Sequence, residues 1–125
     1  MNEQRVLILD DEPTVGERLK PALEKLGFVV EVFTKSREAL KRLDERDFHV
    51  VVTDLKMEGP DGLEVLGLVK RRSPGSQVIM ITGYGSFEQA REAEALGAYD
   101  FVSKPFKLEE LCKRVVKAAK KAVLE

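Results

Sequence analysis

The chain has 125 residues, of which 43% are hydrophobic and 34% are charged, and its formal net charge is −1. This composition is typical of one soluble globular domain, assigned here to residues 1–125, and it excludes an intrinsically disordered chain. Because the charges nearly balance, the composition gives no reason to expect binding to nucleic acid or to a membrane surface.

Short β-branched runs alternate with amphipathic segments along the whole chain. The runs have the length of strands, and the segments carry apolar residues at helical spacing. Ser, Thr and Gly residues between them are typical of helix caps and helix ends. In chain order, the predicted elements are a strand over 5–9, a helix over 13–26, a strand over 28–33, a helix capped by Thr34 or Ser36, a strand over 49–53, a helix over 62–72, a strand over 77–81, a helix capped by Ser86 and ended by Gly97, a strand over 99–103 and a helix over 107–124.

This alternation predicts an α/β fold of (βα)₅ order. Strand–helix–strand units favour a mostly parallel, doubly wound sheet with right-handed crossovers and helices on both faces. The continuous apolar runs over 6–9 and 78–81 are typical of strands that are buried on both faces. The carboxyl ends of such strands meet at one edge of the sheet, which is where this class of fold binds ligands.

Charged and hydroxyl side chains stand at four of these strand ends. Asp10 and Asp11 follow the first strand, Asp54 the third, Thr82 the fourth and Lys104 the fifth. Carboxylate oxygens are the ligands that Mg²⁺ prefers, whereas an ammonium and a hydroxyl suit a phosphoryl group. A carboxylate beside Mg²⁺ can also attack phosphorus and form an acyl phosphate. The pattern therefore predicts a site for Mg²⁺ and phosphoryl chemistry.

Each of these residues also has an ordinary structural interpretation. Asp10 and Asp11 can cap the following helix, and Asp54 can cap a turn. Thr82 can bond the glycine turn after it, and Lys104 can be a surface lysine. Only their joint occurrence at four strand ends favours a functional site over these interpretations.

The same residues lie in four strings that resemble the receiver domain of two-component response regulators, and the resemblance covers essentially the whole chain. It implies a flavodoxin-like sheet with strand order 2-1-3-4-5. Among receivers, the chain looks most like those of sigma-54-dependent transcription activators. The strings are Val6-Leu7-Ile8-Leu9-Asp10-Asp11-Glu12, Val51-Val52-Thr53-Asp54-Leu55-Lys56-Met57 with Asp61-Gly62-Leu63-Glu64-Val65-Leu66, Ile79-Met80-Ile81-Thr82-Gly83-Tyr84-Gly85, and Gly97-Ala98-Tyr99-Asp100-Phe101 with Lys104-Pro105-Phe106.

The resemblance implies a role for each acid of the site. Asp54 would be the phosphoacceptor and a metal ligand, Asp11 a direct Mg²⁺ ligand, and Asp10 a ligand through water. The backbone carbonyl of Lys56 would be a further Mg²⁺ ligand. A sensor histidine kinase would donate the phosphoryl group to Asp54.

The resemblance also implies a switch that reports phosphorylation. Thr82 would bond a phosphoryl oxygen, and Lys104 would pair with the phosphoryl group, or with Asp54 before phosphorylation. The Lys104-Pro105 bond would be cis. Movement of Thr82 would let Phe101 turn inward and change the surface of the fourth helix, fifth strand and fifth helix. That surface would control an output such as transcription, and it could form a homodimer.

Such a receiver is a signalling phosphoacceptor that promotes its own phosphorylation and dephosphorylation, and it is not an enzyme with a separate substrate. We expect it in the cytoplasm, either as a stand-alone regulator or as a receiver with an output domain C-terminal to it, and without direct contact with nucleic acid or membrane. No apolar run is long enough for a transmembrane helix, and residues 1–5 lack the apolar core of a signal peptide. The single cysteine, Cys112, excludes an internal disulfide and fits a reducing compartment.

Two rival functions remain on the sequence alone. A binding module that works without phosphorylation would be expected to lack an acid, Thr82 or Lys104, and none is missing. A phosphohydrolase with an aspartate nucleophile would need a second acid two residues after Asp54, where Lys56 stands. Both rivals are therefore less favoured than a receiver.

Two further positions carry structural expectations only. Met57-Glu58 stands where the family often has Met-Pro, and Pro60 follows two residues later. The stiffness of this loop is therefore expected to differ from that of other receivers. His49 opens a predicted buried strand and is interpreted as a packing residue.

Overall fold

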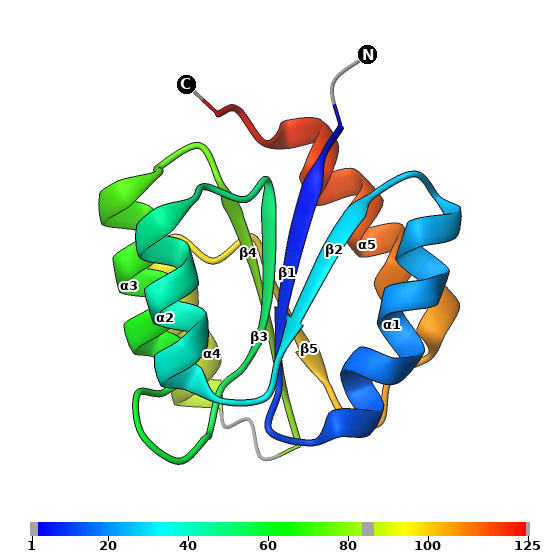
Figure 1. Cartoon of the computed structure of the whole chain (residues 1–125). Coiled ribbons are helices and arrows are strands. Elements are labelled where there is room, and N and C mark those ends of the chain that lie inside the picture. The colour runs from blue at the N-terminus through cyan, green and yellow to red at the C-terminus, as the bar shows by residue number, and fades with distance from the viewer. Residues whose placement is uncertain (1–2, 84–86, 125) are drawn as a thin grey trace.

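A computed structural model describes residues 3–83 and 87–124 of the chain. In these ranges five parallel strands form one sheet in the order β2-β1-β3-β4-β5, and five helices cover it (Figure 1). The predicted (βα)₅ alternation and strand order are confirmed. The elements are β1 (Arg5–Leu9), α1 (Pro13–Lys25), β2 (Val29–Phe33), α2 (Ser36–Glu45), β3 (Val50–Asp54), α3 (Gly62–Arg72), β4 (Gln77–Thr82), α4 (Phe87–Ala95), β5 (Asp100–Ser103) and α5 (Leu108–Lys121).

The sheet lies between two helical layers. α1 and α5 cover one face, and α2, α3 and α4 cover the other (Figure 1). In β1, Val6 and Ile8 pack on the side of α1 and α5, whereas Leu7 and Leu9 pack on the opposite side. All four side chains are fully buried, which explains why β1 is a continuous apolar run. None of the helices in the described ranges is long and apolar enough to cross a membrane.

The two strands that carry Asp54 and Thr82 end later than the sequence indicates. β3 ends at Asp54 and β4 ends at Thr82, each one residue later than predicted. Asp54 pairs with Ile81, and Thr82 pairs with Ser103, so the sheet itself holds both residues. The other ends for which the sequence gives a residue agree with the structure within three residues.

The predicted cap of α2 is wrong. Lys35 is the N-cap residue, and no side chain caps this end, so neither Thr34 nor Ser36 has that role. The buried Ser36 hydroxyl instead donates to the Glu58 carbonyl at 3.2 Å and so ties α2 to the loop after β3. Ser86, the predicted cap of α4, lies outside the described residues.

Candidate functional site

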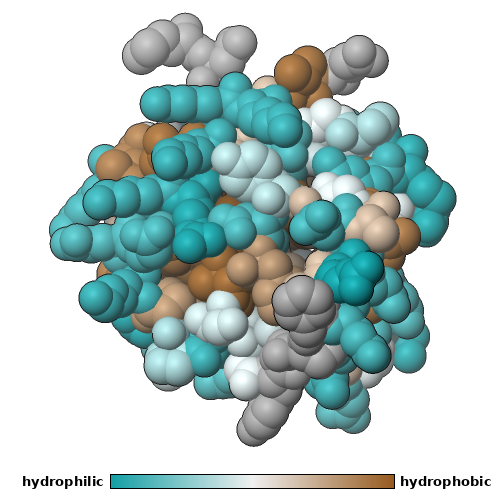
Figure 2. Space-filling model, turned by 180° about the vertical axis from the view of Figure 1, so that it is seen from behind, coloured by the Kyte–Doolittle hydropathy of each residue, from teal (hydrophilic) through white to brown (hydrophobic). Residues whose placement is uncertain are grey.

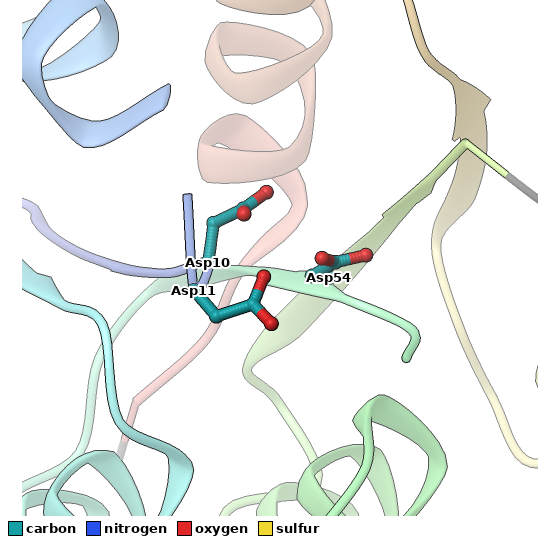
Figure 3. Close-up of side chains that lie close together, drawn as sticks. All are labelled: Asp10, Asp11 and Asp54. Atoms are coloured by element: carbon teal, nitrogen blue, oxygen red, sulfur yellow. The ribbon is translucent and has the colours of Figure 1, made fainter. Parts of the chain in front are cut away.

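Three carboxylates meet at the carboxyl edge of the sheet. Asp10 and Asp11 directly follow β1, and Asp54 is the last residue of the adjacent strand β3 (Figure 3). One carboxylate oxygen from each residue lies within 4.8 Å of the other two. Asp10 is 2% exposed and Asp54 is 6% exposed, whereas Asp11 is open to solvent. The three acids that the sequence places at strand ends therefore do lie together.

Backbone contacts hold Asp54 in place. The Leu55 N–H donates to the Ile81 carbonyl at 2.9 Å, which continues the β3–β4 pairing one residue past Asp54. Gly62 begins α3, and its N–H donates to the Leu55 carbonyl at 2.8 Å. A Cβ atom at Gly62 would overlap the Asp54 carbonyl oxygen and the Met80 sulfur. Only glycine allows α3 to begin this close to the end of β3.

The loop from β3 to α3 carries Lys56, the residue whose carbonyl is expected to bind metal. The Lys56 side chain is exposed. Gly59 has a φ of 85°, which favours glycine, and the Glu58 carbonyl accepts the hydrogen bond from Ser36. The loop that departs from the family pattern at Met57-Glu58 is therefore anchored to α2.

Lys104, which follows β5, reaches across to the acids. Its ammonium nitrogen lies 2.8 Å from Asp10 Oδ2, 3.0 Å from Glu12 Oε1 and 3.5 Å from Asp54 Oδ2. The backbone N–H of Lys104 donates to the Thr82 carbonyl at 2.8 Å, so β4 holds the backbone from which this side chain extends. The Lys104 ammonium thus forms ion pairs with three carboxylates, and Asp54 is the most distant of them.

Glu12 belongs to the site, although no role was predicted for it. It is the N-cap residue of α1, and its N–H donates to Asp10 Oδ1 at 2.8 Å. Its carboxylate lies closer to the Lys104 ammonium than that of Asp54 does. In the sequence, the feature that could have indicated this role is that Glu12 is the third consecutive acid after β1. Glu12 therefore competes with Asp54 for Lys104.

Burial and repulsion oppose ionisation of the acids. Burial, and next the charge of Asp10, raises the pKa of Asp54 to about 6, although Lys104 opposes this shift. Burial also raises the pKa of Asp10, again against the effect of Lys104. Burial disfavours the charged form of Lys104, but its contacts with Asp10, Glu12 and Asp54 outweigh burial and raise its pKa. The site therefore has more negative charge than one ammonium can offset.

A divalent cation fits this arrangement. Three carboxylates offer oxygens within 4.8 Å of one another, and hard cations such as Mg²⁺ and Ca²⁺ prefer oxygen ligands. Asp10 Oδ2 is buried, and the Lys104 ammonium lies 2.8 Å from it. A bound cation would offset the repulsion that raises the pKa of Asp54. The cluster of acids could therefore hold a metal ion.

The remaining predicted residues lie in β4, in β5 and just after β5. Thr82 is buried at the end of β4, beside the strand that carries Asp54. Phe101 pairs with Met80, is half-buried and packs against the core on the side of α2, α3 and α4. The Lys104–Pro105 peptide bond is cis. Thr82 and Lys104 thus reach the edge that holds the acids, whereas Phe101 lies further back in the sheet.

Comparisons with known proteins relate this geometry to one family. Residues 6–116 match the family profile of the response regulator receiver domain. An NtrX-like response regulator of Rickettsia felis is 38% identical over 125 residues, which cover 96% of this chain and 26% of that protein. The response regulator protein PilR of Pseudomonas aeruginosa is 34% identical over 118 residues, which cover 94% of this chain and 26% of that protein. The beryllofluoride-activated NtrC4 receiver domain dimer, a solution structure, has a TM-score of 0.87 at 38% identity, with 94% of this chain and 97% of that chain covered.

The matched residues include all of those predicted for the site. The chain spans about a quarter of the length of these two curated relatives. The sheet order, the three acids at its carboxyl edge and the profile match over residues 6–116 agree with one another. The chain belongs to the family of response regulator receiver domains, the phosphoacceptor modules of two-component signalling.

Proposed function

We propose that Asp54 is the residue that accepts the phosphoryl group, and that a phosphohistidine of a sensor histidine kinase donates it. The observation that carries this proposal is the setting of Asp54. It ends a central strand and is 6% exposed, with two further carboxylates and the Lys104 ammonium beside it. A carboxylate in such a setting can attack phosphorus once positive charge offsets that of the incoming group.

In the proposed reaction, an ionised Asp54 oxygen forms a bond to phosphorus while the bond from phosphorus to the donor's imidazole nitrogen breaks. The electron pair of the broken bond stays with the imidazole, and the product is an acyl phosphate. Lys104 pairs with one phosphoryl oxygen, and the Thr82 hydroxyl donates to another. The same groups would promote hydrolysis of the acyl phosphate, so that the signal decays.

The proposed metal is Mg²⁺, held by Asp11, by Asp54, by Asp10 through water and by the backbone carbonyl of Lys56. Bound Mg²⁺ supplies positive charge against the phosphoryl oxygens. The three adjacent carboxylates support this proposal, as does the raised pKa of Asp54, which results from burial and next from the charge of Asp10. Asp11 is the exposed member of the three and is therefore open to a hydrated cation.

Phosphorylation is proposed to change the output surface, defined here as the surface of α4, β5 and α5. Thr82 would move toward the phosphoryl group, and Phe101 would turn inward behind it. Arg114 on α5 already pairs with Asp100 of β5 at 2.7 Å, so one ion pair links these two elements. Only a difference in contacts between the two states can shift their populations.

The proposed outcome is control of transcription by an output domain C-terminal to the chain, in the cytoplasm. The NtrC4 receiver domain is described as a dimer in its beryllofluoride-activated form. We extend this to a homodimer of the present domain through the output surface. Sedimentation at about 100 μM with and without beryllofluoride tests this extension, and an unchanged monomer would contradict it.

Intact mass spectrometry tests the assignment of Asp54. The wild type, Asp54→Ala and Asp44→Ala are each treated with acetyl phosphate and Mg²⁺, and then with acetyl phosphate and EDTA. Asp44 is the matched control because its side chain is 75% exposed on α2. We expect one phosphate on the wild type and on Asp44→Ala, with Mg²⁺ only, and none on Asp54→Ala. An unchanged phosphate gain in Asp54→Ala would reject the assignment.

A further inference from the structure

A groove of about 950 Å³ runs between α1 and α5, and the proposed phosphorylation site contributes no residue to it. Its apolar lining consists of Ala22 from α1, Leu26 directly after α1, and Leu108, Cys112 and Val116 from α5. These residues recur four apart, so each helix contributes a continuous apolar line. Leu26 is 55% exposed and so offers apolar surface to a partner. Seen from behind, the molecule shows apolar patches among hydrophilic side chains on the side of α1 and α5 (Figure 2).

Both edges of this groove are basic. α1 contributes Arg18 and Lys25, and α5 contributes Lys113, Lys117 and Lys120. Across the described ranges, none of these five cations has a carboxylate within ion-pair distance. Basic side chains that have no ion pair in the described ranges thus border the apolar lining on both sides.

The acids of the groove are confined to one end. Glu109 and Glu110 lie in the first turn of α5, and Glu110 pairs with Arg114 at 3.4 Å. Lys117 and Lys120 lie toward the other end of α5, and Lys25 is in the last turn of α1. α1 and α5 run in the same direction in Figure 1, so these three cations share one end. The groove therefore has an electrostatic direction as well as an apolar lining.

We propose that this groove binds an amphipathic helix of a partner protein, and that acidic residues flank the apolar face of this helix. A helix laid between two parallel helices can bury its apolar face on their apolar lines. Its acids would then face the basic edges, which favours correct encounter and register. The densest acids of the partner helix lie against Lys25, Lys117 and Lys120.

Two other occupants fit the groove less well. A second copy of the domain, docked about a two-fold axis, would offer only Glu109 and Glu110 to the cations of the facing groove, and Glu110 already pairs with Arg114. Nucleic acid would satisfy the cations, but its phosphates would leave Leu26 and Val116 without an apolar partner. An acidic amphipathic helix can both cover the apolar residues of the groove and pair with the cations at its edges.

The test uses two fluorescein-labelled designed helical peptides of about 18 residues, a length that supports helix formation. They share one apolar stripe, which is flanked by Glu in the first peptide and by Lys in the second. We expect fluorescence anisotropy to show saturable binding of the Glu peptide only, weakened by added salt. The double variant Lys25→Glu/Lys117→Glu should bind it about tenfold less tightly or worse, and Leu26→Ser should also weaken binding.

Lys20→Glu is the matched control, because Lys20 is an exposed cation of α1 that does not line the groove. It should leave the affinity unchanged. Equal binding of the two peptides, or equal affinity of the double variant and the wild type, would overturn the proposal. So would a single-stranded DNA of equal charge that binds as tightly as the Glu peptide, or self-association that Leu26→Ser abolishes. Each variant is first shown to gain phosphate from acetyl phosphate, which separates this result from a failure of the proposed function.

Discussion

The two ends of the sheet differ in the partners of their buried polar groups. At the amino end, the Arg5 N–H donates to His49 Nδ1 at 2.9 Å, and the Ser76 hydroxyl donates to the Phe48 carbonyl at 2.6 Å. These bonds join neighbouring elements, and each partner is neutral. Pairing of this kind avoids the free energy penalty of a buried polar group without a partner.

At the carboxyl end, by contrast, like charges are forced together. Asp10 and Asp54 are buried beside each other, and burial raises the pKa of both carboxyls. Lys104 compensates for only part of this charge. The contrast teaches that the amino end stabilises the fold, whereas the carboxyl end keeps a destabilising charge cluster that a cation and a phosphoryl group can use.

The largest expected effect comes from disturbing the backbone at the carboxyl end. Gly62→Ala would push a Cβ atom into the Asp54 carbonyl oxygen, the Met80 sulfur and the Leu55 Cα. We expect the free energy of unfolding, measured by urea denaturation, to fall by about 3 kcal/mol. Backbone atoms at this position cannot move aside without shifting β3.

Gly67→Ala is the control within the same helix. The nearest atom to its new Cβ would be the flexible Arg71 Nη1, at 3.2 Å. Alanine is favoured over glycine in a helix interior, so this variant should gain up to about 1 kcal/mol. A Gly62→Ala variant as stable as Gly67→Ala would show that the carboxyl end is not tightly packed.

The next effect should have the opposite sign. Asp54→Asn keeps the side-chain shape and removes one charge from the cluster. Because the pKa of Asp54 is raised to about 6 from an ordinary 3.8, its ionised form destabilises the folded state. This penalty is fully present above about pH 6, and it disappears as the pH falls below 3.8.

In EDTA, Asp54→Asn should therefore be about 2 kcal/mol more stable than the wild type at pH 7.5, and no more stable at pH 3.5. Thermal or urea unfolding at the two pH values measures the difference. Asp44→Asn, at an exposed position, should show no gain. A loss of stability in Asp54→Asn at pH 7.5 would contradict the view of the carboxyl end as a destabilising cluster.

The fold could be predicted from the sequence because its signals are local. The apolar run of β1 and the start of α3 at Gly62 are each visible within a few residues. The acids at the strand ends could be placed for the same reason, since parallel strands align their carboxyl ends.

Contacts between distant segments could not be predicted in this way. The place of Glu12 beside Lys104 depends on two residues 92 positions apart, and the bond from Ser36 to Glu58 depends on how α2 meets a loop. Strand pairing likewise extends β3 to Asp54, which no local pattern shows. Such contacts follow only after the chain has folded.

A smaller effect is expected at the amino end. Ser76→Ala would remove the hydroxyl that donates to the Phe48 carbonyl at 2.6 Å and contacts the Ser73 hydroxyl at 2.7 Å. Because Ser76 is buried, loss of this bond should lower the free energy of unfolding by about 1.5 kcal/mol. Phosphate gain from acetyl phosphate should stay unchanged. A slower phosphate gain would show that the two ends are coupled.

The smallest expected effect concerns the pH dependence of stability, which has opposite signs at the two ends of the sheet. Burial, and next the charge of Arg5, lowers the pKa of His49, whose Nδ1 accepts the Arg5 N–H. The folded state thus favours neutral His49. This preference stabilises the fold above the ordinary His49 pKa of 6.5, and the stabilisation is lost as the pH falls below that value. Asp10 and Asp54 act in the opposite direction, because their raised pKa values make the fold less stable as the pH rises.

His49→Asn isolates the histidine contribution, because a side-chain amide oxygen can replace Nδ1 as the acceptor but does not titrate. Between pH 7.5 and 5.5, the wild type should lose stability relative to this variant, and the loss should be small because His49 is partly exposed to solvent. Asp54→Asn should change the slope over the same range in the opposite sense. Because the two sites lie at opposite ends of the sheet, the double variant should show the sum of the two slope changes. A non-additive result would mean that protonation at one end alters the other, so that the two ends could no longer be treated as independent.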